Sequence, residues 1–358
     1  MINYILKRIF YGTLVLWGVI TLVFFLFNVL PGDPARMMLD KREDSNQLAI
    51  IKNKYGFDRS ISEQYILYLN DISPISIHFI SDNSFTSLKH GKYQFKKLFS
   101  GTDYDIVLKI PYLRESFAQI GTPVSVILVN TFKNTFVLAL TSILLAILLG
   151  LFSGVLAALY KDTLIDRFIL FFSVLGMSLP SFFASIIIAW FFGFVLHNYT
   201  GLNMAGSLYE VDDYGRGSFL KLSNLVLPVI TLAIRPLSVI IQLCRNSFLE
   251  VLSMQYVRTA TAKGLSKFNV LFKHALRNAL NPLVTAISGW FASMLAGAVF
   301  VEYIFGWNGI GKEIVDALNM MDLPVVMGSV LFIASIFVIL NIIVDLIYGW
   351  LDPRIRYN

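Results

Sequence analysis

The chain has 358 residues, of which 56% are hydrophobic and only 15% are charged, and its mean hydropathy is +0.68. Soluble domains carry about 25% charged residues, so this composition excludes an ordinary soluble domain and indicates a protein that spans a membrane several times. The net charge of +6 does not indicate nucleic-acid binding, because the basic residues lie in loops beside hydrophobic runs. The single cysteine, Cys244, excludes an internal disulfide framework.

Six hydrophobic runs are each long enough to cross a hydrocarbon core about 30 Å thick as an α-helix. They cover residues 9–30, 133–158, 168–196, 225–244, 282–304 and 325–348. The short loops on one side of these runs contain 12 Lys and Arg residues, against 3 on the other side. Since basic residues favour the cytoplasmic side, we predict an all-α polytopic membrane protein with six transmembrane helices and both termini in the cytoplasm.

The segment between the first two runs, residues 31–132, is predicted to form a large external loop. It begins with helical patterns: Gly56 fits the end of one helix, and Ser60 with Glu63 forms a capping box that starts the next. The helical pattern is lost over residues 73–113, which we interpret as an insertion where lysines alternate with aromatic residues. A solvated loop is favoured there over a docking surface for an external partner.

The rest of the chain divides around the hydrophobic runs. The other predicted parts are an N-terminal segment with the first helix (1–30), a transmembrane core with helices two to six (133–350) and a cytoplasmic tail (351–358). Pro180 and Pro236 fall inside the third and fourth runs, where the missing backbone N–H is expected to bend or loosen the helix. Gly150 and Gly154 allow a close helix contact, either within this chain or with another subunit.

The inner loop at residues 245–281 is polar and basic, yet it is patterned as two amphipathic helices. Its first helix is expected to place Phe248, Leu249, Leu252 and Tyr256 on one face, and Gly264 interrupts the pattern. After Gly264, the apolar face is expected to contain Phe268, Leu271, Phe272, Ala275 and Ala279. Such a pair could lie on anionic lipid headgroups. The helix–Gly–helix pattern instead favours a short helix that is presented to the groove of a soluble partner.

This loop resembles the coupling loop of ABC importer permeases, in which a fixed glycine separates two helices. The segment Tyr256–Leu265, followed by His274–Ala279, is similar to the peptide and nickel permease branch, although Arg258-Thr259-Ala260 stands where the general family has Glu-Ala-Ala. Further segments typical of that branch extend over almost the whole chain except about 73–113. They are Tyr4–Arg8, Leu30–Pro34, Tyr55–Asp58, Ser178–Phe182, Gly297–Glu302, Gly306–Gly311 and Leu351–Arg356.

The resemblance, to the B-type permease subunit of dipeptide and oligopeptide importers, implies a type I ABC importer permease fold in a bacterial or archaeal cytoplasmic membrane. It implies as partners a second homologous permease, two cytoplasmic ATP-binding subunits and an external substrate-binding protein. ATP and Mg would be bound by the partner subunits, and no cofactor by this chain. The cargo would be peptides, with nickel chelates or glutathione as alternatives. The residues implied to couple to the ATPase are Tyr256, Arg258, Thr259, Ala260, Lys263, Gly264 and Leu265.

The sequence does not favour an enzyme. It contains no Gly-x-x-x-x-Gly-Lys-Ser/Thr segment, so this chain is not expected to hydrolyse ATP by the P-loop route. It also lacks His-Glu-x-x-His and Gly-x-Ser-x-Gly, and its four histidines are scattered. A secondary transporter that works alone is the alternative, but that class often has internal repeats and several ionisable groups at mid-membrane, and here only one charge falls in mid-run.

That charge is Arg235, near the middle of the fourth run. A charged residue at the centre of a membrane helix costs about 2.5–3.5 kcal/mol on insertion scales, so it is usually retained for a function. Arg235 is a candidate for the translocation path, where it could face a peptide carboxylate. The alternatives are an internal ion pair with Glu302 or Asp345, or a different boundary of the run.

Overall fold

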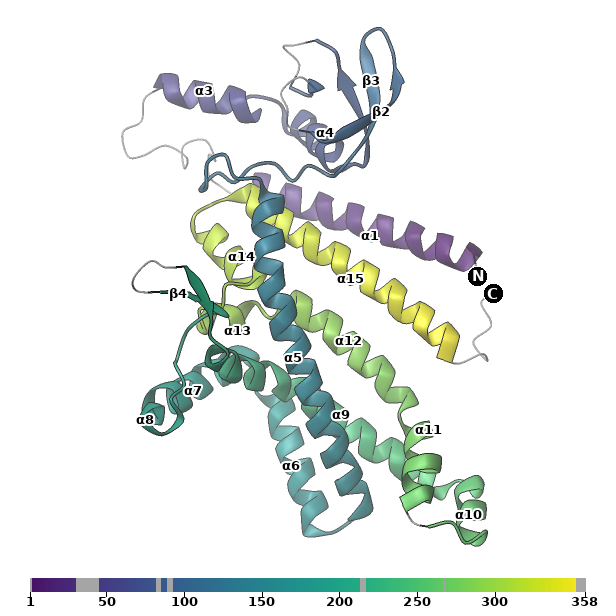
Figure 1. Ribbon diagram of the computed structural model, residues 1–358. Coiled ribbons are helices and arrows are strands. Elements are labelled where there is room, and N and C mark those ends of the chain that lie inside the picture. The colour runs from purple at the N-terminus through teal and green to yellow at the C-terminus, as the bar shows by residue number, and fades with distance from the viewer. Residues whose placement is uncertain are drawn as a thin grey trace. The chain divides into compact units, whose positions relative to one another are not determined.

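The computed structural model (Figure 1) describes residues 2–29, 45–81, 85–88, 93–212, 217–266 and 268–351, and these are mostly helical. The chain divides into two compact units. The larger unit contains Met1–Phe10, Thr131–Lys312 and Ser335–Asn358, and the smaller unit contains Tyr11–Asn130 and Glu313–Ala334. The segments 30–34 and 352–356, which contributed to the family resemblance, and the tail beyond Leu351 lie outside the described residues.

Within the described residues, four helices are long and apolar enough to cross a membrane. They are α1 (Ile2–Val29), α5 (Val124–Leu159), α9 (Ser223–Ser253) and α15 (Leu323–Leu351). Two bent pairs raise the number to six if each pair is one span. The first pair is α6 (Leu164–Ser178) with α7 (Ser181–Ile188) and the π-helix η2 (Ala189–Val195); the second is residues 269–279 with 282–296. These helices occupy the positions of the six hydrophobic runs. The bent pair at the fifth run begins at residue 269, earlier than the run expected at 282–304.

The two prolines in the runs have different effects. The axis turns by 107° between α6 and the helical segment Ser181–Val195, and Pro180 lies at the break. Leu179, the residue before the proline, is extended (φ −75°, ψ 123°), which is the conformation that proline imposes on its predecessor. The expected bend at Pro180 is therefore confirmed, whereas α9 continues as a helix through Pro228 and Pro236.

The core of the larger unit contains a close contact between α5 and α9. A Cβ atom on Gly150 would lie 2.6 Å from Ile240 Cγ2, and one on Gly154 would lie 2.6 Å from Cys244 Cβ. Glycine is therefore required at both positions for the two helices to approach this closely. Of the two possibilities that the sequence left open for Gly150 and Gly154, the structure supports packing within the chain.

The remaining elements of the larger unit connect its long helices. They are α8 (His197–Thr200), the two-stranded sheet of β4 (Tyr209–Val211) and β5 (Ser218–Leu220), α10 (Gln255–Ala262), the π-helix η3 (Asn269–Leu276), α11 (Arg277–Ala279), α12 (Asn281–Gly297) and α13 (Val299–Ile304). Helix α14 (Ile310–Asn319) begins in this unit and continues into the smaller one. Glu302 is fully buried and accepts the backbone N–H groups of Gly311 (2.6 Å) and Lys312 (3.4 Å), so it caps the start of α14.

The smaller unit contains α3 (Ser45–Tyr55) and α4 (Ile61–Ile72). Gly56 follows α3 with φ +73°, and the Ser60–Glu63 capping box is present at the start of α4, so both helix signals are confirmed. Helix α4 packs against α1 in a cluster of Phe24, Tyr68, Ile72 and Met327. The segment predicted to be an external loop therefore contains helix α4 packed on the end of the first candidate span.

The segment 73–113 contradicts the expectation of an all-α chain. It forms an antiparallel sheet in the order β1-β3-β2, from β1 (Ile75–Phe79), β2 (Phe95–Ser100) and β3 (Tyr104–Lys109). The helical pattern is absent from this segment, as expected, but its strands were not predicted from the sequence. Their alternation was overlooked because the apolar and polar residues follow a period of two rather than the helical period. The fold is mostly helical with two small sheets among the described residues.

Candidate functional site

The predicted inner loop begins at a sharp break in the chain. Helix α9 ends at Ser253, Met254 is extended (φ −71°, ψ 147°), and α10 begins at the next residue. One extended residue changes both the direction and the phase of a helix. Tyr256 was expected to share the apolar face of Phe248, but this break separates them: Phe248 is buried, while Tyr256 is exposed.

Helix α10 ends as abruptly as it begins. Lys263 donates its backbone N–H to Thr259 and Leu265 donates to Ala260, so the last turn is closed by backbone hydrogen bonds. Gly264 has φ +78°, a conformation that favours glycine because it carries no Cβ. A Cβ on Gly264 would meet no atom within 4 Å, so the requirement for glycine is set by the backbone alone. The predicted helix–Gly–helix arrangement is present.

A small apolar core holds α10 in place. Val257 and Ala260, on its inner side, are buried in one cluster with Phe248 and Val251 from α9. The same cluster includes Ala158 from the end of α5, and Val270, Ala275 and Ala279 from the segment after Gly264. The ends of α5 and α9, helix α10 and the segment after Gly264 therefore share one apolar core.

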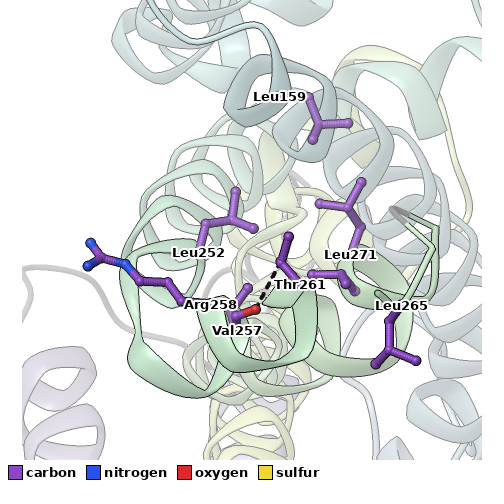
Figure 2. A pocket seen from close by; sticks show the side chains of 8 residues that line it. Leu159, Leu252, Val257, Arg258, Thr261, Leu265 and Leu271 are labelled. Carbon is purple, nitrogen blue, oxygen red and sulfur yellow. Dashed lines mark hydrogen bonds between the residues drawn. The ribbon is translucent and has the colours of Figure 1, made fainter. Parts of the chain in front are cut away.

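Beside this core is an open hollow of about 320 Å³ (Figure 2). Its lining is mainly apolar and comes from Leu159, Leu252, Val257, Leu265, Val270 and Leu271, with Arg258 and Thr261. Figure 2 shows the side chain of Arg258 extending away from the leucines, so its guanidinium group lies at the periphery of the hollow. The Thr261 hydroxyl donates to the Val257 carbonyl (3.0 Å), which leaves the hollow with little free hydrogen-bonding capacity.

The residues implied to couple to an ATPase lie together on and after α10. Six of the seven are exposed: Tyr256, Arg258, Thr259, Lys263, Gly264 and Leu265. Ala260 is buried in the apolar core and so anchors the helix rather than contacting a partner. Tyr256 is held in position because its hydroxyl accepts a hydrogen bond from the Asn278 side chain (2.7 Å), which ties α10 to α11.

The helix after Gly264 differs from the predicted amphipathic α-helix. Phe268 and Phe272 were expected on the buried face with Leu271 and Ala275, but both phenylalanines are exposed and their rings lie 4.5 Å apart. Residues 269–276 form the π-helix η3, whose i→i+5 bonding puts more residues in each turn than an α-helix. Phe268 directly precedes η3 and Phe272 lies within it, while Val270 and Ala275, five residues apart, are the buried residues. The sequence periodicity gave no signal of this winding.

A buried ion pair beside the loop was missed in the sequence. Arg245 on α9 binds Asp166 at the start of α6 in a bidentate geometry, with Nε–Oδ1 2.6 Å and Nη2–Oδ2 2.7 Å. Asp166 also accepts the backbone N–H of Asp162 (2.9 Å). The side chain of Asp166 is 3% exposed and that of Arg245 is 14% exposed. The pair therefore joins the α5–α6 turn to α9, the helix that precedes α10.

Arg235 lies in the middle of α9, far from either end of the helix. It is exposed and borders a hollow of about 80 Å³ with Ser181, Thr231, Trp290 and Ser293. Arg235 forms no hydrogen bond or ion pair with the described residues. The two internal partners considered for it are engaged elsewhere.

Asp345 pairs with Arg8 at 3.0 Å, and Glu302 caps α14. An ion pair between Arg235 and either carboxylate is thus excluded in this structure. In the part of the chain that the structure describes, no group of three or more His, Cys, Asp or Glu side chains could hold a metal ion.

Comparisons with known proteins identify the family of the chain. The family model for the inner membrane component of binding-protein-dependent transport systems matches residues 146–357, and the model for the N-terminal part of such components matches residues 1–84. The chain is 32% identical over 374 residues to a di/tripeptide transport system permease of Pseudomonas aeruginosa, with 100% of both chains covered.

Two further relatives also match over the full length. The chain is 32% identical over 361 residues to a dipeptide transport system permease of Bacillus subtilis, covering 100% of this chain and 99% of the relative. It is 31% identical over 358 residues to a glutathione transport system permease of Salmonella typhimurium, covering 100% of both. The chain therefore belongs to the family of inner membrane components of binding-protein-dependent transport systems, the permease subunits of ABC importers.

Proposed function

We propose that this chain is one of two permease subunits of an ABC importer that carries di- or oligopeptides across the cytoplasmic membrane of a bacterium or archaeon. The match to peptide permeases over the full length supports this cargo. The excess of Lys and Arg on one side of the hydrophobic runs supports six spans with both termini in the cytoplasm. The chain is thus proposed to function as a multi-pass protein within the bilayer.

In this proposal α10 is the element to which a cytoplasmic ATP-binding subunit binds. The observation that carries it is the combination of a fixed inner edge, Val257 and Ala260, with an outer surface of exposed residues from Tyr256 to Leu265. A short helix that is anchored on one side and exposed on the other fits the groove of a soluble partner. The breaks at Met254 and Gly264 separate α10 from the helices before and after it, so it is presented as a distinct short helix.

The other components of the importer are inferred from the family. The partners are a second homologous permease, two ATP-binding subunits and an external substrate-binding protein. ATP and Mg are bound by the ATP-binding subunits, and this chain requires no cofactor. The parts of the chain keep the assignments made from the sequence: an external loop at 31–132, a permease core at 133–350 that contains the coupling loop 245–281, and a tail at 351–358.

Arg235 is proposed to line the translocation path and to bind the carboxylate of a passing peptide. Three features support this: its position midway along α9, the hydroxyl groups of Ser181, Thr231 and Ser293 around the same hollow, and the engagement of Glu302 and Asp345 with other groups. A guanidinium group presents paired donors that match a carboxylate. Glutathione is a second candidate cargo, favoured by the glutathione permease relatives, and it also carries carboxylates.

The test uses the complete importer in proteoliposomes. Arg235→Gln is expected to reduce uptake of a dipeptide with a free C-terminal carboxylate much more than uptake of its amide, while ATP hydrolysis continues. Arg258→Gln on α10 is the matched control, because it removes the same charge from the coupling loop and is expected to alter ATP hydrolysis without altering the preference between the two peptides. Equal loss for both peptides in Arg235→Gln would exclude carboxylate binding by Arg235.

A separate measurement tests the assembly. Purification of the tagged chain in mild detergent is expected to retain stoichiometric ATP-binding subunits. Substrate uptake by the chain alone, driven by a proton or sodium gradient, would contradict the proposed dependence on ATP.

A further inference from the structure

The sheet of the smaller unit has an inverted distribution of side chains. In an antiparallel sheet with one face in water, apolar residues normally point inward and polar residues outward. Here strand β1 buries Ser76 and His78 and exposes Ile75, Ile77 and Phe79. Strand β3 behaves in the same way over most of its length, because it buries Asp105 and Lys109 while Tyr104 and Leu108 are exposed.

The strand register gathers the exposed apolar residues into one surface. Ile75 lies opposite Leu108, and Phe79 lies opposite Tyr104, across the β1–β3 pair. Strand β2 adds Phe99, which lies opposite Ile106 of β3. We call Ile75, Ile77, Phe79, Phe99, Tyr104 and Leu108 the outer sheet face; each of these residues is between 41% and 61% exposed.

Hydrogen bonds fix this inverted orientation. His78 is fully buried, and its ring nitrogens lie 2.8 Å from the Ser76 hydroxyl and 2.7 Å from the Thr86 carbonyl. Asp105 pairs with Lys97 at 2.6 Å. A one-residue slip of either strand would expose these pairs and bury the apolar face, so the polar partners hold the register. The outer sheet face is therefore a specified feature of the fold.

The position of the sheet relates it to the membrane. Helix α4 lies against the end of the α1 span: the Tyr65 hydroxyl is 2.6 Å from the Thr21 hydroxyl, and Phe24 is buried beneath α4. Thr21 is seven residues before the end of the apolar span at Asn28, about 10 Å along a helix. Helix α4 therefore contacts the α1 span about 10 Å before the end of its apolar stretch.

The sheet in turn is held to α4. The Asn70 side chain donates to the carbonyl of Ile77 (2.9 Å) and accepts its N–H (3.0 Å). The outer sheet face therefore begins within a few residues of a helix that lies alongside a lipid-facing span, of which only 17% is buried within the chain. This places the strands at the level where hydrocarbon gives way to headgroups.

We propose that the outer sheet face rests on the bilayer, with its aliphatic and aromatic side chains in the boundary between headgroups and acyl chains. Apolar-out and polar-in alternation is the pattern of strands that face lipid. Tyr104 and Phe79 supply the aromatic rings that favour this boundary. Lys96 of β2 lies opposite Leu108, and therefore on the same face, and it is exposed where its long side chain can reach anionic headgroups. A receptor that docks and leaves in every cycle would meet a more polar surface, because transient interfaces are about as polar as the rest of a protein.

The experiment measures what surrounds this face in the complete importer in liposomes. Ile77→Cys and Leu108→Cys are each labelled with an environment-sensitive fluorophore, and Thr102→Cys in the exposed β2–β3 turn is the matched control. The unmodified chain serves as the blank, since its one cysteine, Cys244, is buried. Uptake and ATP hydrolysis of each variant report that it has folded.

Brominated acyl chains are expected to quench the labels at positions 77 and 108, with no effect at position 102. Aqueous iodide is expected to quench the label at position 102 and to leave the labels at positions 77 and 108 unquenched. Quenching by iodide at all three positions would overturn the proposal, because the face would then lie in water. Protection of positions 77 and 108 from both quenchers would also overturn it and would identify a protein partner as the cover.

Discussion

The buried pair between Asp166 and Arg245 predicts a measurable dependence of stability on two residues far apart in the sequence. Replacement of one partner leaves the other charge buried without its counter-charge, which costs about 3–5 kcal/mol for a buried ion pair. Arg245 is 14% exposed, so some water reaches it after Asp166→Ala, and the lower end of that range is expected. Asp166→Ala also removes the acceptor for the Asp162 N–H, which adds about 1 kcal/mol.

The order of stabilities therefore follows from the geometry. Asp166→Ala is expected to lose about 4 kcal/mol, and Arg245→Ala up to about 5 kcal/mol, because it leaves Asp166, which is only 3% exposed, without its counter-charge. The double variant is expected to be about 2 kcal/mol more stable than the sum of the single losses predicts. Lys161→Ala is the control, because Lys161 contacts Asp162 only at 4.0 Å on the surface and its loss is expected to cost at most about 0.5 kcal/mol.

The assay is denaturant unfolding of the purified subunit in detergent, analysed as a double-mutant cycle. The single variants should also weaken the coupling of ATP hydrolysis to transport, because the pair joins α6 to the helix that leads into α10. The amount of substrate transported per ATP hydrolysed is therefore measured in the reconstituted importer. The charge-swapped variant, Asp166→Arg with Arg245→Asp, is expected to recover part of both quantities. Strictly additive single losses would refute the reasoning, because they would mean that the two charges do not depend on each other.

Three further predictions concern single sites. Gly264→Val is expected to uncouple ATP hydrolysis from transport because φ +78° strains a β-branched residue by about 1–3 kcal/mol, whereas Gly264→Asn, which tolerates this conformation, should retain coupling. Gly154→Val is expected to reduce the yield of folded protein, since its side chain would collide with Cys244; Gly289→Ala, where a Cβ meets nothing within 4 Å, is the comparison in a size-exclusion assay. Burial lowers the pKa of Lys109 to about 8, whereas its unfolded value is 10.5, so between these values the unfolded chain binds more protons than the folded one. The sheet of β1, β2 and β3 should therefore gain stability as pH rises from 8 to 10.5. Lys109→Met should abolish this gain in hydrogen exchange corrected for intrinsic rates, and an unchanged pH dependence would contradict the assignment to Lys109.

The elements that could be predicted from the sequence are those specified by local chemistry. The apolar runs predicted the long helices, because a membrane requires about 20 apolar residues in a row whatever their neighbours are. Gly56 and Gly264 were identified as helix ends, and both have a positive φ, which is a local demand of the backbone. The capping box at Ser60 and Glu63 is equally local, since its partners are three residues apart.

The missed features depend on contacts that a local pattern does not contain. Asp166 and Arg245 are 79 residues apart, so nothing near either residue indicates the other. The winding of η3 depends on how its residues pack against α9 and α10, and an α-helical period placed Phe268 on the wrong side. The strands of the insertion were missed for a different reason: β1 and β3 alternate with a period of two, which a search for the helical period does not detect.

Helix α9 connects three of these features along one continuous element of the larger unit. Arg235 lies near its middle, Arg245 binds Asp166 further on, and the helix passes into the coupling loop at Met254. Pro236 removes one backbone hydrogen bond directly after Arg235, so the helix is most easily bent there. Because the pair with Asp166 makes the following half of α9 move with α6, a pull on α10 would be expected to bend α9 at Pro236 and to reorient Arg235. The charge proposed to hold the cargo thus lies at the point where a force from the coupling loop would change the direction of the helix.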